Sequence, residues 1–210
     1  MTIRLHRGDL VDLSRYSPEK SPFVAIDTET LGLNPHRDRL CVVQLSPGDG
    51  SADVVQIPAG AGPGSAPNLE ALLADPGIVK LFHFARFDVA VLGKAFGVPV
   101  EPIWCTKIAS KLTRTYTDRH GLKELARELI GVDLSKQQQS SDWAAEDLTE
   151  AQLQYAASDV LYLHAIREKL VAMLAREGRT ALAESCFRFL PTRAALDLAG
   201  WPEEDIFAHS

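Results

Sequence analysis

The sequence predicts an α/β layered domain, and three observations lead to that fold class. Apolar runs typical of buried strands fill much of the first half of the chain, and helical patterns are interleaved with them and then follow them. The 210 residues are 46% hydrophobic and 24% charged, a composition suited to a packed core. The length fits one domain with, at most, a small appendage.

The first three predicted strands form an antiparallel meander. Residues 23–27 are an apolar run that ends in acids, residues 40–45 are rich in valine and leucine, and residues 53–57 follow soon afterwards. The segment Pro47-Gly-Asp-Gly-Ser51 joins the last two strands with residues that favour turns. A surface loop is expected over residues 58–67, which are rich in glycine and proline.

Helices and strands then alternate before the chain becomes mostly helical. A short helix is expected from about Leu69, a strand over residues 79–82, a helix over residues 85–96 and a short strand over residues 103–105. Gly97 ends the longer of these helices.

Two further helices are predicted in the second half of the chain. Thr149 has the character of an N-cap, and Gln152 stands three residues later as its capping-box partner. Apolar residues then recur at helical spacing as far as Leu170, so one face of this long helix belongs to the core. The last helix is predicted to end at Leu190, because Pro191 cannot continue it.

The cysteines and the apolar runs indicate a cytoplasmic protein. Cys41, Cys105 and Cys186 are widely spaced and match no zinc or disulfide pattern, so reduced thiols are expected. The N-terminal segment lacks the apolar run of a signal peptide, and no apolar stretch approaches the length of a membrane span. We therefore expect no membrane partner.

The charge pattern bears on nucleic-acid binding. A net charge of −6 argues mildly against a protein that binds long nucleic acid, but clustered acids in a metal-dependent nuclease would also lower the total. One segment reverses the balance, because five cations face only Asp118 there: Lys107, Lys111, Arg114, Arg119 and Lys123. Either a strip that contacts phosphates or a solvated helix face is compatible with this pattern.

Four acids and a tyrosine are the candidate catalytic residues. Asp27 and Glu29 lie two apart at a strand end and share a face, while Asp88 falls in the first turn of a predicted helix. Tyr155 and Asp159 are one helical turn apart and point the same way. Each acid taken alone also fits an ordinary loop or helix position. Together they are what a two-metal phosphodiester hydrolase needs.

His83 offers an alternative that the spacing disfavours. A histidine before an acid suggests the general base of a histidine-type exonuclease, but His83 precedes Asp88, and Gln154 occupies the matching position before Asp159. His83 is interpreted as a strand-end residue near the substrate, or as part of the core.

These motifs resemble the DEDD 3′–5′ exonucleases in their tyrosine variety, and most of all the ribonuclease D group. The resemblance covers roughly residues 3–175. It rests on the acids, on the runs LSKQQQSSDW at 134–143 and LTEAQLQYAASDV at 148–160, and on the segment DTETLGLNPHRDRL at 27–40, which is similar to the opening motif of oligoribonuclease. The chain lacks room for the C-terminal helical RNA-binding domains of ribonuclease D. In size it is similar to the compact nanoRNase C type of alphaproteobacteria.

The resemblance implies a fold, a reaction and a metal site. It implies a ribonuclease H-like mixed sheet flanked by helices, with an exonuclease domain over residues 1–175 and a helical extension over 176–210 that is not a separate domain. Two divalent cations, Mg²⁺ or Mn²⁺, would be held by the four acids, and Tyr155 would orient or deprotonate the attacking water. Nucleoside 5′-monophosphates would leave from the 3′ end of short single-stranded RNA, down to dinucleotides.

The resemblance also implies substrate contacts and an assembly. Thr30, Leu33, His83 and Lys136 are the candidates for contact with nucleotides, and the position of Leu33 wedges against terminal bases in oligoribonuclease. Core packing for Leu33 and an ordinary loop position for Lys136 stay open. The compact relatives form rings, so a homo-oligomer is expected.

Three rival hypotheses remain at this point. The first is a DNA-trimming exonuclease of the same superfamily, since recognition of the 2′-hydroxyl group decides between RNA and DNA. The second is a catalytically silent nucleic-acid-binding or scaffolding module, which would be expected to have lost some of the acids. The third is an unrelated α/β metalloprotein with an accidental match, which the length of the match opposes.

Overall fold

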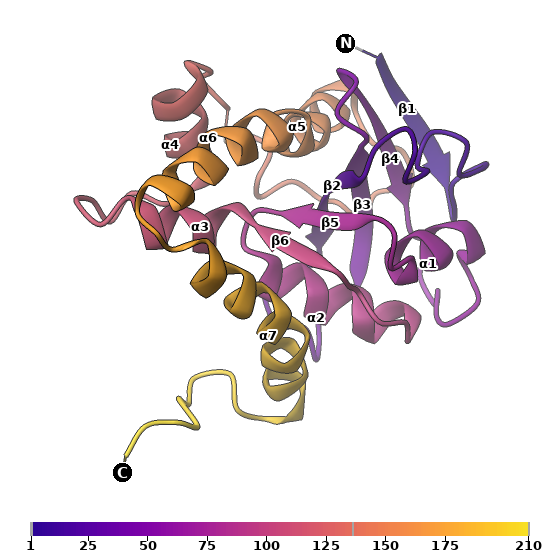
Figure 1. The fold of residues 1–210 in the computed structure, drawn as a ribbon. Coiled ribbons are helices and arrows are strands. Elements are labelled where there is room, and N and C mark those ends of the chain that lie inside the picture. The colour runs from indigo at the N-terminus through magenta and orange to yellow at the C-terminus, as the bar shows by residue number, and fades with distance from the viewer. Residues whose placement is uncertain (1, 136, 210) are drawn as a thin grey trace.

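A computed structural model describes residues 2–135 and 137–209 and confirms the predicted α/β class. Six strands form one mixed sheet in the order β1-β4-β3-β2-β5-β6, with helices packed around it (Figure 1). The strands are β1 (Thr2–Arg7), β2 (Phe23–Thr30), β3 (Leu40–Ser46), β4 (Ser51–Gln56), β5 (Val79–Phe82) and β6 (Ile103–Cys105). The predicted contact residue Lys136 lies outside the described residues.

The strand pairing confirms the meander and adds three parallel pairs. β2 pairs antiparallel with β3, and β3 pairs antiparallel with β4. β5 runs parallel to β2, β6 runs parallel to β5, and β1 runs parallel to β4 at the opposite edge.

The edge strand β1 is absent from the sequence prediction. Four of its six residues are exposed, and charged side chains such as Arg4 and Arg7 interrupt any apolar run. Its contacts are partly polar, since His6 Nε2 lies 2.9 Å from the buried Asp53 carboxylate of β4. Only Ile3 and Leu5 alternate with polar residues in this segment, a pattern too short to identify a strand.

The individually predicted helices are present, although two of them end elsewhere than predicted, and residues 106–130 add helical segments that the prediction does not place. They are α1 (Pro67–Ala74), α2 (Ala85–Phe96), α3 (Thr106–Thr113), α4 (Leu122–Leu125) with a π-helical turn at Ala126–Ile130, α5 (Glu150–Leu161), α6 (Leu163–Arg176) and α7 (Thr180–Ala199). The capping box of Thr149 and Gln152 at the start of α5 is confirmed. None of the helices in the described part of the chain combines the length and apolar character needed to cross a bilayer.

The single long helix predicted after Thr149 is wrong. The chain bends at Tyr162, where α5 ends and α6 begins. α5 lies over β1 to β4, whereas α6 contacts β2, β5 and α3. The apolar residues recur without a break in the sequence, but the two halves pack against different parts of the domain. The helix axis therefore changes direction at Tyr162.

The predicted end of the last helix at Leu190 is also wrong. α7 continues through Pro191 to Ala199. Its apolar face is buried on both sides of the proline, by Phe187 and Leu190 before it and Ala194 after it. Packing of α7 against α2 and β6 therefore offsets the backbone hydrogen bond that the proline cannot donate.

The two faces of the sheet are covered by different helices. Val42 and Val54 pack with Ala156 of α5 and with Trp143. Their sequence neighbours Val43 and Val55 point to the other face, into the larger core that includes residues of α1 and α2. This alternation also decides which way the acidic end of β2 presents its side chains.

Candidate active site

The end of β2 places two acids on the face covered by α5. In the antiparallel pairing, Asp27 stands opposite Gln44 and Glu29 stands opposite Val42. Directly paired residues share a face, so both carboxylates point toward the α5 side of the sheet. They line a cleft of about 670 Å³.

Asp159 of α5 completes a three-acid cluster. One carboxylate oxygen from each of Asp27, Glu29 and Asp159 lies within 4.8 Å of the others. Tyr155, one turn earlier on α5, lines the same cleft, as the helical spacing predicts. Trp143 is buried and packs against the Tyr155 ring, with ring centroids 5.9 Å apart.

Asp88 reaches the cleft from the other face of the sheet. Thr28 points to that face, between the two acids of β2, and its hydroxyl donates a 2.7 Å hydrogen bond to Asp88 Oδ1. Asp88 is buried in the first turn of α2 and lines the cleft, but it lies outside the three-acid cluster. The structure thus brings all four predicted acids to one cleft, and three of them have carboxylate oxygens within 4.8 Å of one another.

The four carboxyl groups are in an environment that disfavours their charge. Burial raises the pKa of Asp27 to about 7, and burial together with the charge of Asp27 raises the pKa of Glu29 to about 9. Burial and the charge of Asp27 likewise raise the pKa of Asp88 and of Asp159 well above the ordinary value. Such a cluster requires compensating positive charge if it is to be ionised near neutral pH.

The donor set fits divalent cations. Carboxylate oxygens are the ligands that Mg²⁺ and Mn²⁺ prefer, and no cysteine or histidine joins the cluster among the described residues. The cationic side chains in the described lining of the cleft are Lys107 and Lys123. We call the four buried or half-buried acids the floor of the cleft and its more exposed lining side chains the rim. Two lysines do not balance the charge of four carboxylates, and a bound cation would supply the missing positive charge.

Gln44 is a site residue that sequence reasoning missed. It is fully buried on β3, and its Nε2 donates a 3.1 Å hydrogen bond to Asp27 Oδ2. Its Oε1 has no partner among the described protein atoms. The available signal was one amide in an otherwise apolar strand, a position where a polar side chain needs a specific partner.

His83 lies at the cleft as a neutral acceptor. Thr106 donates its hydroxyl proton to the carbonyl of Phe82, so His83 Nδ1, 2.8 Å from the same hydroxyl oxygen, must be the donor between those two. Burial, with the nearby Lys107 charge, lowers the pKa of His83 to about 3. The ring is therefore neutral at pH 7 and keeps Nε2 as a hydrogen-bond acceptor.

Leu33 is presented by a closed loop after β2. The hydroxyl of Thr30 donates a 2.5 Å hydrogen bond to the carbonyl of Gly32, so Thr30 supports the loop. An added Cβ at Gly32 would stand 2.4 Å from Asp38 Oδ2, so a side chain here would have to displace the Asp38 carboxylate. Leu33 is 85% exposed at the rim of the cleft, so the alternative of core packing is wrong.

The cations of the basic segment do not share one surface. Lys107 and Lys123 line the cleft. Arg114, in contrast, is fully buried, forms an ion pair with Glu128 and donates a 2.6 Å hydrogen bond to the carbonyl of Arg119. The cluster of cations in the sequence therefore combines two cleft residues with a structural arginine.

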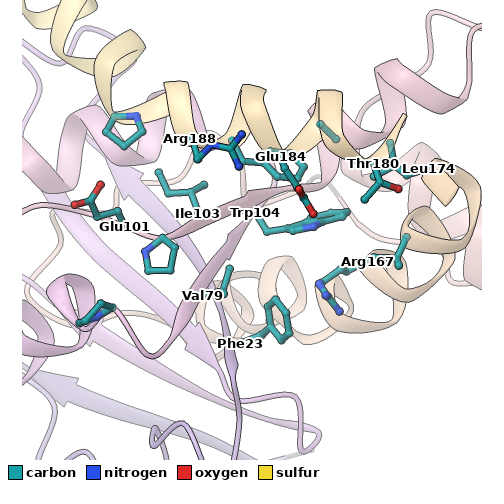
Figure 2. A pocket seen from close by; sticks show the side chains of 16 residues that line it. Phe23, Val79, Glu101, Ile103, Trp104, Arg167, Leu174, Thr180, Glu184 and Arg188 are labelled. Atoms are coloured by element: carbon teal, nitrogen blue, oxygen red, sulfur yellow. The ribbon is translucent and has the colours of Figure 1, made fainter. Parts of the chain in front are cut away.

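A second cavity, of about 740 Å³, is lined by a different set of side chains (Figure 2). It lies between α6, α7 and the β6 edge of the sheet, and none of the four predicted acids lines it. Arg167 stacks there over the Phe23 ring at 3.6 Å from its centroid and near Trp104. Because this cavity lacks the acid cluster, the smaller cleft is the candidate active site.

Most of the chain is similar to known proteins. A family model described as 3′–5′ exonuclease matches residues 10–175. Ribonuclease D of Acidiphilium cryptum is 38% identical over 158 residues, which are 75% of this chain and 39% of that protein. The chain thus spans about two fifths of the length of the curated ribonuclease D relatives it matches.

Solved structures of one protein in different states resemble the whole chain. Brucella melitensis NrnC with bound Mg²⁺ has a TM-score of 0.94 and 65% identity, and the match covers all of both chains. The same protein bound to pGG has a TM-score of 0.95 and 66% identity over the same coverage. Escherichia coli ribonuclease D has a TM-score of 0.72 and 29% identity. The match covers 84% of this chain and 46% of that chain. The predicted fold of the DEDD exonucleases is confirmed.

Proposed function

Because this chain belongs to the 3′–5′ exonuclease family, we propose that it hydrolyses short RNA from the 3′ end to nucleoside 5′-monophosphates. The acid cluster of Asp27, Glu29 and Asp159, with Asp88 and Tyr155 in the same cleft, carries the proposal. The full-length likeness to a protein solved with pGG supports a short substrate, down to the dinucleotide.

The four acids would hold two divalent cations, Mg²⁺ or Mn²⁺. When bound, such ions lower the pKa of a coordinated water and stabilise negative charge on the attacking and leaving oxygens. The protein contributes the fixed positions of the carboxylates. β2 fixes Asp27 and Glu29, the donor Gln44 orients Asp27, and the donor Thr28 orients Asp88.

Tyr155 would orient the attacking water rather than deprotonate it. Burial and the neighbouring charge of Asp159 raise the pKa of the phenol above its ordinary value of 10.0. A phenol with a raised pKa keeps its proton at pH 7, so it acts as a hydrogen-bonding group. Packing against Trp143 limits the positions of the ring.

Two side chains that line the cleft would contact the nucleotides. Leu33 offers an apolar surface to a base, a contact that tolerates any sequence. His83 Nε2 would accept a hydrogen bond from a sugar hydroxyl group, because a neutral imidazole with Nδ1 protonated offers no charge to a phosphate. Thr30 supports the loop that carries Leu33.

The remaining expectations are proposals of the same kind. The exonuclease domain would cover residues 1–175, and residues 176–210 would extend it, as the 2.6 Å bond from Arg86 on α2 to Asp197 on α7 suggests. A cytoplasmic location fits the three free cysteines. A homo-oligomeric ring is the proposed assembly, which size-exclusion chromatography with light scattering would test.

End-labelled RNAs of graded length, starting with the dinucleotide, test the proposal. In Mg²⁺ or Mn²⁺, we expect stepwise loss of 5′-monophosphates from the 3′ end and faster turnover of the shortest substrates. Matched DNA oligomers in parallel give the sugar selectivity, and the Asp159→Asn variant is the control for contaminating nucleases. Products that shorten from the 5′ end, or activity equal in the variant, would contradict the proposal.

A further inference from the structure

Phe84 has a backbone conformation that its side chain does not favour. It lies between β5 and α2 with φ 72° and ψ 43°, in the left-handed region, and it is the one non-glycine residue with positive φ among residues 2–135 and 137–209. Glycine or asparagine adopts this conformation readily, whereas a bulky residue is strained there. Strain of this kind is retained mainly where the side chain has a function.

Neither the turn nor the core explains the choice of phenylalanine. The turn directs the chain from β5 into α2 and so places Asp88 in the first helical turn, but a glycine would form the same turn without strain. The core does not use the ring fully either, because Phe84 is 44% exposed. The reason for an aromatic side chain must therefore lie outside the packed interior.

The exposed ring lies at the rim of the acidic cleft. Phe84 lines the same cleft as Asp88 and Leu33. Lys107, from the first turn of α3, places its Nζ 4.2 Å from the centroid of the Phe84 ring and also lines the cleft. The Leu33 side chain, the Phe84 ring and the Lys107 ammonium group thus line the same cleft as the carboxylates that would hold the cations.

We propose that Phe84 and Lys107 form a stacking subsite for a substrate nucleotide, in which the ring supports a base and the ammonium group faces the phosphate. This inference rests on the proposed function of the cleft. Base stacking on an aromatic ring and phosphate contact by lysine are the usual combination in proteins that bind single strands. The strained turn fixes the ring in place, so less motion is lost when substrate binds.

A Phe84→Gly variant separates binding from folding. Glycine relieves the positive φ, so the melting temperature should stay the same or rise. The dissociation constant for an RNA dinucleotide, measured with Ca²⁺ in place of Mg²⁺, should increase about 5-fold or more, in line with the loss of one stacked base. Phe84→Tyr should restore tight binding, since it keeps the ring.

Substrate analogues identify which group contacts the ring. For a dinucleotide whose bases are replaced by hydrogen, Phe84→Gly should have no effect on affinity, because no base remains to stack. Lys107→Met should weaken both ligands and reduce the salt dependence of binding. Phe207→Ala removes an aromatic side chain that is 76% exposed and does not line the cleft. It should leave the dissociation constants for both ligands unchanged, and it serves as the matched control.

Two results would overturn the subsite. One is unchanged affinity of Phe84→Gly for the dinucleotide, and the other is an equal loss for the base-free analogue. Failure of the proposed function would look different, since the unaltered protein would then release no nucleotide from RNA at all.

Discussion

The floor and the rim of the cleft are built in opposite ways. On the floor, carboxylates are partly or fully buried and receive hydrogen bonds from Gln44 and Thr28. On the rim, Leu33 and Phe84 are exposed, and the Lys107 ammonium group lies over the Phe84 ring. This difference fits the proposed roles, in which strand geometry positions the acids for the reaction and the exposed apolar side chains contact the substrate.

The largest expected effect comes from the floor. Replacing Asp159 with asparagine should lower kcat by about 10³-fold or more, because the charge that holds a cation is lost and several kcal/mol of transition-state stabilisation goes with it. Without metal, the variant should melt at a higher temperature, because one charge fewer is forced into the cluster. Calorimetry in EDTA measures the melting temperature, and single-turnover kinetics measure the rate of hydrolysis. A variant that is both inactive and unstable without metal would point to a folding role instead.

Tyr155→Phe should have the next largest effect. Loss of the hydroxyl that orients the water should reduce kcat by about 10²-fold, while the dissociation constant for substrate stays unchanged, because packing on Trp143 is preserved. Trp143→Phe serves as the control for ring packing. Unchanged turnover in Tyr155→Phe would remove Tyr155 from the reaction.

Gln44→Met tests whether the hydrogen bond from Gln44 to Asp27 supports metal binding. The variant keeps the volume of a buried side chain but removes the donor to Asp27, so metal affinity should fall about 10-fold or more. Titration with Mn²⁺, followed by electron paramagnetic resonance, gives the affinity directly. Metal affinity equal to that of the parent would show that β2 alone positions Asp27.

Leu33→Ala tests the rim and should give a smaller effect. Removal of an exposed side chain should raise KM for the dinucleotide by about 3-fold, from lost apolar contact, and should leave kcat and metal affinity unaltered. A large fall in kcat with unchanged KM would contradict the division between floor and rim.

The stability of the metal-free protein should depend on pH in a defined direction. The folded-state pKa values of Asp27 and Glu29 are raised above their ordinary values, so their neutral forms stabilise the fold at low pH and this stabilisation is lost as pH rises. The melting temperature in EDTA should therefore fall between about pH 5 and about pH 9. Mg²⁺ should restore it most at the alkaline end, and Glu29→Gln should flatten the profile.

The sequence predicted the elements that have their own periodicity or motif. The acids of β2, α2 and α5 could be placed because strand and helix spacing fix their direction, and the capping box fixed the start of α5. The edge strand β1 escaped prediction because its residues are mostly exposed and partly charged. The course of α7 through Pro191 depends on burial by distant elements, which no local pattern records.

The supporting residues of the site were harder to predict than the acids. Gln44 matters because strand pairing places it opposite Asp27, and that register exists only in the folded sheet. Phe84 stands out through its backbone conformation, which the residue type alone would have argued against. Asp88 reaches the cleft from the opposite face of the sheet, where Thr28 donates a hydrogen bond to it. This too follows from the alternation of side chains along β2, once the strand pairing is known.

A crystal soaked in Mn²⁺ tests the central claim most directly, because anomalous scattering locates the ions. We expect two peaks between the carboxylates of Asp27, Glu29, Asp88 and Asp159, and their loss in the Asp159→Asn variant. Absence of any peak among these side chains, or peaks confined to the cavity around Arg167, would contradict the account.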